Sequence, residues 1–137
     1  MVDLSGLKQY QNVNVETKVN VASPHTLVAM LLDGVLDKLA KAHGYLQRNE
    51  ISAKGQEISS AIKILDTLRV SLDMEKGGEI ANNLHDLYEY MANRLLEANR
   101  DSNPDIIREI QTLISEIKTG WDSISDSSRE VPLATGH

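Results

Sequence analysis

Apolar side chains recur every three or four residues in several long stretches of this chain. The first stretch begins at Pro24, and its apolar positions are Val28, Leu31, Leu32, Val35, Leu36, Leu39 and Ala42. This spacing places side chains on one face of an α-helix. It predicts a helix with a wide apolar face from about Pro24 to about Leu46.

The residues before this stretch favour a helix start. The Ser23 hydroxyl can accept a hydrogen bond from a free backbone N–H, and Pro24 stands where a missing N–H costs nothing. The dipeptide Asp33-Gly34 is a local signal against a continuous helix, because Asp-Gly between apolar runs often marks a turn. The apolar pattern continues in phase past Gly34, so we expect the helix to continue through it.

Three further helices follow by the same reasoning. The second starts near Ser52 and carries Ile58, Ala61, Ile62, Leu65, Leu68 and Leu72 on one stripe. Paired glycines at 77–78 end that pattern. The third runs from about Glu79 to Arg100, with Ile80, Leu84, Leu87, Tyr88, Met91, Leu95 and Ala98 in phase. The fourth begins at Pro104, and its main stripe is Ile106, Ile110, Leu113, Ile117, Trp121 and Ile124, widened by Ile107 and Ile114.

Four helices of about twenty residues joined by short connections predict one all-α domain, an antiparallel up-and-down four-helix bundle. We place the bundle at residues 21–124. Residues 1–20 form a polar leader or cap that we expect to be flexible, and residues 125–137 form a Ser-rich tail that we expect to be disordered.

Composition excludes several classes of protein. The chain has no cysteine, so it has neither a disulfide framework nor a thiolate metal site. A net charge of −6 and an aromatic content of 4% argue against nucleic-acid binding. The apolar runs are too short for a membrane span, so membrane insertion is not expected, and the N-terminus does not have the pattern of a secretory signal.

The residues that could carry chemistry are scattered. A di-metal bundle needs Glu-x-x-His on two helices, a spacing that this sequence does not contain. His85 and Glu89 could share a helix face, but two ligands do not make a metal site. A histidine phosphotransfer bundle is the alternative, with His43 or His85 as the phosphorylated residue, although neither has basic neighbours. We therefore expect neither an enzyme nor a cofactor.

Each predicted helix has more apolar positions than a narrow seam requires. The surplus could leave a surface for an amphipathic helix of a partner. It could also serve self-association of a purely architectural bundle.

Several short motifs, in order and at compatible spacing, resemble one known family. They are Leu7-Lys8-Gln9-Tyr10, Ala22-Ser23-Pro24-His25, Asp33-Gly34, Ala53-Lys54-Gly55, Glu75-Lys76-Gly77-Gly78-Glu79-Ile80-Ala81, Leu87-Tyr88-x-Tyr90-Met91 and Trp121-x-x-Ile124. On these residues the chain resembles the FliS family of flagellar secretion chaperones, over roughly residues 7 to 124. Leu32 departs from the family pattern, in which many members carry an aromatic residue before Asp-Gly.

The resemblance implies a cytoplasmic, non-enzymatic chaperone. By that resemblance, it binds the C-terminal segment of flagellin, prevents premature polymerisation, and delivers the flagellin to the export gate protein of the flagellar type III secretion system. The anti-sigma factor that times late flagellar genes is a further partner in some family members.

We expect the surplus apolar positions and the leader to form the contact surface for flagellin. The resemblance favours Leu7 and Tyr10. The further candidates, chosen from the helical stripes, are Ile58, Ile62, Leu65, Tyr88, Leu95 and Ile107. The leader could cover this surface in the free protein and move aside when flagellin binds.

Overall fold

A computed structural model describes residues 23–123, which form four α-helices and contain no β-strand. The helices are α2 (Pro24–Gln47), α3 (Ile51–Val70), α4 (Met74–Asp101) and α5 (Pro104–Asp122). This confirms the predicted all-α bundle. The predicted leader and tail lie outside the described residues.

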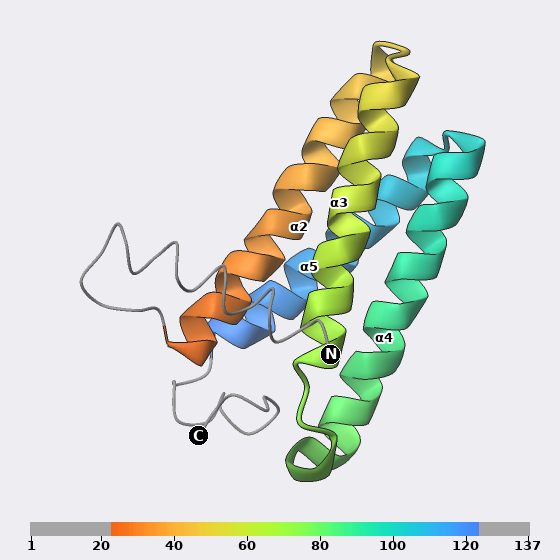
Figure 1. Ribbon diagram of the computed structural model, residues 1–137. Helices are drawn as coiled ribbons and strands as arrows, with labels where there is room; N and C mark the ends of the chain where they lie inside the picture. The colour runs from red at the N-terminus through yellow and green to blue at the C-terminus, as the bar shows by residue number, and fades with distance from the viewer. Residues whose placement is uncertain (1–22, 124–137) are drawn as a thin grey trace.

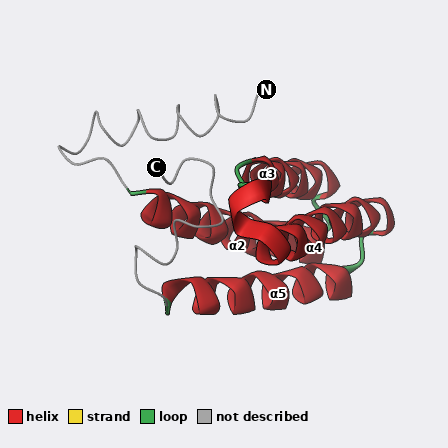
Figure 2. Cartoon of the chain, turned by 90° about the horizontal axis from the view of Figure 1, so that it is seen from below, coloured by secondary structure: helices red, strands yellow, loops and turns green. Residues whose placement is uncertain are grey.

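The four helices form a closed ring of neighbours. α2 packs against α3, α3 against α4, α4 against α5, and α5 returns to α2. Successive helices run in opposite directions, and α5 crosses obliquely behind the other three in Figure 1. Seen along the bundle in Figure 2, α5 forms one side of the ring. The up-and-down topology follows from the short connections, which leave a helix no room to return parallel to its predecessor.

Polar side chains cap the N-termini of three of the helices. The Thr26 backbone N–H donates to the Ser23 hydroxyl (3.1 Å), and Pro24 takes the first helical position of α2. The Asn103 side chain accepts from the Asp105 N–H (2.9 Å) at the start of α5, which also begins with a proline. These caps satisfy backbone donors that have no partner within the helix. The predicted helix starts at Pro24 and Pro104 are therefore confirmed.

α4 begins earlier than predicted. Asp73 caps it by accepting from the Lys76 N–H (3.0 Å), so a first turn over Met74–Gly77 precedes the predicted start at Glu79. The predicted break is nevertheless present, because Gly78 has non-helical angles (φ 56°, ψ −130°) inside the helix. A positive φ is readily adopted by glycine, which lacks a Cβ. The paired glycines thus bend α4 where the pattern indicated a stop.

The core is built from the apolar stripes, with two corrections. In α5 the fully buried positions include Ile107 and Ile114, whereas Leu113 and Ile117 are only half-buried. Ile106, Ile110 and Trp121 of the predicted main stripe are buried, but Ile107 and Ile114, predicted only to widen it, are buried more deeply than Leu113 and Ile117. In α4, Ile80 was predicted on the core stripe but is 64% exposed.

Asp33-Gly34 lies inside the continuous helix α2, as the periodicity predicted. A Cβ built on Gly34 would lie 3.3 Å from Cδ1 of Ile64 in α3. A side chain at this position would press on Ile64, so the glycine permits close approach of the two helices.

Candidate protein-binding site

The residues predicted to contact a partner lie mostly in the core. Five of them are at most 3% exposed: Ile58, Leu65, Tyr88, Leu95 and Ile107. Ile62 is half-buried against the core. Leu7 and Tyr10 lie outside the described residues. The five buried side chains hold the helices together, so contact with a partner would require the bundle to open around them. Their role in binding stays a prediction.

Other large apolar side chains are exposed among residues 23–123. They are Ile51, Val70, Met74, Ile80, Tyr90 and Leu96. Ile80 and Leu96 have the largest exposed fractions, 64% and 57%. Single exposed apolar residues are normal on a protein surface, so only a group of them on one face would indicate a binding site.

Ile80 belongs to such a group on α4. It precedes Leu87 by seven residues and Arg94 by fourteen, which keeps all three on one side of the helix. Arg94 contacts Glu109 of α5, so this side of α4 faces α5. Leu84 and Leu87 are half-buried, and Ile80 at the far end of the row is largely exposed. The core stripe of α4 thus continues beyond the part that its neighbours cover.

α5 supplies the other half of this group. Leu113 follows Glu109 by one helical turn, and Ile117 follows it by two, so both lie toward the side of α5 that contacts Arg94. Both are half-buried. The two helices are antiparallel, and in Figure 1 they lie close near the α4–α5 turn and diverge toward the start of α4. We call Ile80, Leu84, Leu87, Leu113 and Ile117 the α4–α5 strip.

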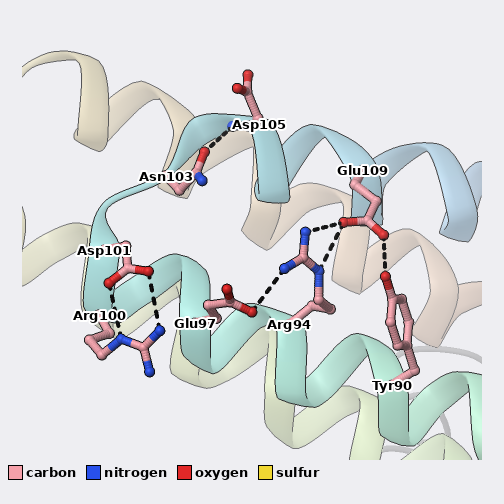
Figure 3. A network of polar contacts seen from close by, with 8 residues as sticks. All are labelled: Tyr90, Arg94, Glu97, Arg100, Asp101, Asn103, Asp105 and Glu109. Atoms are coloured by element: carbon pink, nitrogen blue, oxygen red, sulfur yellow. Dashed lines mark hydrogen bonds and ion pairs between the residues drawn. The ribbon is translucent and has the colours of Figure 1, made fainter.

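A polar network marks the end of the strip at which the two helices meet (Figure 3). Arg94 donates to Glu97 (2.8 Å) and, through two of its nitrogens, to Glu109 (3.1 and 2.8 Å). The Tyr90 hydroxyl donates to the other oxygen of Glu109 (2.5 Å). Hydrogen bonds from Tyr90 and Arg94 favour the charged carboxylate, and they lower the pKa of Glu109 from its ordinary value. α4 and α5 are therefore joined here by charged and polar groups.

A buried lysine stabilises the same end of the bundle. Lys54, in the first turn of α3, is 1% exposed and donates to the Asn99 carbonyl and the Ser102 hydroxyl, each at 3.0 Å. Ser102 is the left-handed C-cap of α4 (φ 49°). An ammonium group at a helix C-terminus is favoured by the helix dipole and by the carbonyls that lack a partner there. Lys54 thus ties the α4–α5 turn to α3.

The two histidines of the phosphotransfer alternative are half-buried and lie on different helices. The ring of His85 lies 3.5 Å from the Asp86 carboxylate, and Glu89 is within reach of both. Carboxylates beside a histidine would repel a phosphoryl group, so the surroundings of His85 do not favour phosphotransfer. The same trio is the one group of potential metal ligands found among residues 23–123, and its two carboxylates are exposed, as on many surfaces without a metal.

None of the described helices is long and apolar enough to cross a membrane. Among residues 23–123, the α4–α5 strip contains the most exposed of the large apolar side chains, Ile80.

The comparisons with known proteins decide the family. The model of the flagellar protein FliS matches residues 6–128. This chain belongs to the FliS family. It is 46% identical to the flagellar secretion chaperone FliSB of Pseudomonas aeruginosa over 125 residues, which covers 91% of this chain and 99% of that protein. It is also 46% identical to FliS of Salmonella typhimurium over 126 residues (91% and 93%), and 24% identical to FliS of Bacillus subtilis over 115 residues (84% and 85%).

Membership in the FliS family makes the chain a flagellar secretion chaperone and not an enzyme, which confirms the recognition made from the motifs. The histidine phosphotransfer alternative is not favoured. Ile80 lies in the Glu75–Ala81 run that carried the resemblance to FliS, yet its exposure was not predicted. The available signal was the break at Gly77-Gly78, because a residue just beyond a break lies at the end of its helix stripe.

Proposed function

We propose that this FliS-family chaperone binds the C-terminal segment of flagellin, prevents its premature polymerisation, and delivers it to the flagellar type III export apparatus. The observation that carries the proposal is the α4–α5 strip, an apolar surface continuous with the core stripe of α4. We propose this strip as a contact surface for flagellin. The chain would act in the cytosol, where flagellin is made before export.

The proposal has a simple energetic basis. An amphipathic segment that is unfolded alone exposes an apolar face that favours aggregation. Laying that face on a preformed helical surface buries it and leaves the rest of the cargo free for export. Each apolar side chain that becomes fully buried contributes roughly 1.5–3 kcal/mol before the cost of ordering the segment is subtracted. Five apolar positions in the α4–α5 strip are enough for several such contacts.

The leader residues Leu7 and Tyr10 enter the proposal through the family resemblance. We expect Tyr10→Ala to weaken flagellin binding without much change in the melting temperature. A melting temperature that falls together with the affinity would instead make Tyr10 a packing residue.

Two further partners belong to the same proposal. Delivery requires the export gate protein to recognise the loaded chaperone, and the anti-sigma factor of late flagellar genes is a second expected ligand of the free chaperone. Pull-down of the purified gate protein by the chaperone with and without bound flagellin segment tests the first. Competition between the anti-sigma factor and the flagellin segment tests the second.

Calorimetric titration with the C-terminal segment of flagellin from the same organism tests the central step. We expect a saturable heat of binding and a co-migrating complex on gel filtration. A segment from the exposed middle of flagellin is the control and should give neither. Absence of heat and of complex with the C-terminal segment would contradict the proposal. An apparent molecular size on gel filtration that increases with protein concentration in the absence of the flagellin segment would favour the self-associating bundle.

A further inference from the structure

The far end of α5 is attached to α2. Trp121, near the end of α5, donates its indole N–H to the His25 carbonyl (2.9 Å) and stacks on the His25 ring (centroids 5.4 Å apart, 16° between planes). One helical turn earlier, the Lys118 ammonium lies 3.4 Å from the Asp33 carboxylate of α2. We call His25, Asp33, Lys118 and Trp121 the α2–α5 contact.

The near end of α5 is held elsewhere. The α4–α5 turn is tied to α3 through Lys54, and Glu109 is bonded to Arg94 of α4. A helix fixed to α4 at its start and to α2 at its end must cross the bundle obliquely, as α5 does in Figure 1. The distance between the second half of α5 and the first half of α4 therefore depends on the α2–α5 contact.

We propose that the α2–α5 contact keeps the α4–α5 strip accessible, with Asp33 and Lys118 as positioning residues for cargo binding. This inference rests on the proposed function. If the contact is broken, the half-buried Leu113 and Ile117 of α5 can pack more closely against the half-buried Leu84 and Leu87 of α4, because apolar surfaces on facing helices associate in water. The strip would then be closed to a partner.

The proposal also gives a role to each residue of Asp33-Gly34. Gly34 allows Ile64 of α3 to approach α2, while the adjacent Asp33 holds Lys118 of α5. One dipeptide thus sets the position of α2 against both of its neighbours. Lys118 is bonded to Asp122 as well, and hydrogen bonding to Asp122, with the nearby charge of Asp33, raises the pKa of Lys118. The ammonium is therefore charged throughout the physiological range.

Charge reversal at Asp33 tests the proposal. Asp33→Lys places two ammonium groups against each other, whereas the control Asp37→Lys, one turn along α2, removes only the exposed Asp37–Lys41 pair within that helix (3.2 Å). Trp121 is the only tryptophan in the chain, so its emission reports the contact without interference. We expect Asp33→Lys to shift this emission to longer wavelength and Asp37→Lys to leave it unchanged.

Accessibility of the strip is measured independently of cargo. The chain contains no cysteine, so a Leu84→Cys variant carries a single thiol whose labelling rate reports the exposure of the α4–α5 strip opposite the second half of α5. We expect the Asp33→Lys change to slow labelling and to weaken binding of the flagellin C-terminal segment about fivefold, the upper range for one ion pair. Adding Lys118→Glu to the Asp33→Lys variant should restore a large part of the labelling rate and of the affinity for the flagellin segment.

The outcomes separate this inference from the proposed function. If the unmodified protein does not bind the flagellin segment, the proposed function fails, and the labelling rate still tests the contact. Unchanged labelling and emission in Asp33→Lys would overturn the inference even if flagellin binds. A shift in emission without slower labelling would also overturn it, because the contact would then be broken without closing the strip. A circular-dichroism melt verifies that each variant is folded, and the milder Asp33→Asn replaces any variant that is not.

Discussion

The pair α2–α3 and the pair α4–α5 are both antiparallel neighbours joined by a short turn, yet they are built differently. α2 and α3 approach closely at Gly34 and Ile64, although Leu36, Ile62 and Ile64 are only half-buried against the core. α4 and α5 meet through the Arg94–Glu109 contact, and their apolar side chains stay partly exposed beyond it. In the first pair the large exposed apolar residues are Ile51 and Val70, the first and last residues of α3. The second pair carries Ile80 and Leu96, the two most exposed of these side chains, and Ile80 belongs to the surface that we propose for a partner.

The comparison predicts that core truncations act on stability. Leu65 of α3 is 1% exposed and was a predicted partner residue. Leu65→Ala should lower the free energy of unfolding by about 2–5 kcal/mol, because it leaves a cavity in a packed interior. The matched change at the half-buried Leu113 of α5, Leu113→Ala, should lower the free energy of unfolding by about 1 kcal/mol. Urea denaturation measures both, and equal losses would remove the distinction between the two helix pairs.

The close approach of α2 and α3 can be broken at one position. Gly34→Leu introduces a side chain where even a Cβ would lie 3.3 Å from Ile64, and it should destabilise the protein by about 1–3 kcal/mol through overpacking. Gly120→Leu on α5, where a Cβ meets nothing within 4 Å, is the control and should be neutral or slightly stabilising. If thermal melts rank the two variants the other way, α2 and α3 are not held as closely as described.

The polar junction of α4 and α5 predicts a small pH dependence. The pKa of Glu109 in the folded protein lies below its ordinary value of 4.5. Stability from this group is thus fully present above the ordinary pKa and is lost as the pH falls through the lowered one. Glu109→Gln should reduce the loss of melting temperature between about pH 7 and about pH 3. An identical pH profile for both proteins would mean that Tyr90 and Arg94 contribute nothing through Glu109.

The sequence was sufficient to predict the four helices and the starts of α2 and α5, but neither the start of α4 nor the site. Ser23, Pro24 and Pro104 are local signals whose meaning does not depend on tertiary structure, so the starts of α2 and α5 were predicted correctly. The choice between the rows of Leu113 and Ile114 depends on how α5 is rotated in the bundle, and periodicity alone does not determine that rotation.

The candidate site depends on relations between helices. Ile80 and Met91 lie on one stripe of α4 and look alike in sequence, yet Met91 is fully buried and Ile80 is exposed. Ile80 lies fourteen residues before Arg94, level with the end of α5, so α5 does not cover it. The bond between Arg94 and Glu109 joins two helices, so spacing within one helix could not predict it.

The most direct test of the account compares two exposed apolar residues of α4. Ile80 lies in the α4–α5 strip, while Leu96 is about as exposed but lies sixteen residues further along, on nearly the opposite side of the helix. Calorimetric titration of Ile80→Asp and Leu96→Asp with the flagellin C-terminal segment should show at least about a tenfold loss of affinity for the first variant, from burial of an unpaired carboxylate, and little change for the second. Equal affinities for the two variants would contradict the assignment of the α4–α5 strip as the flagellin-binding surface.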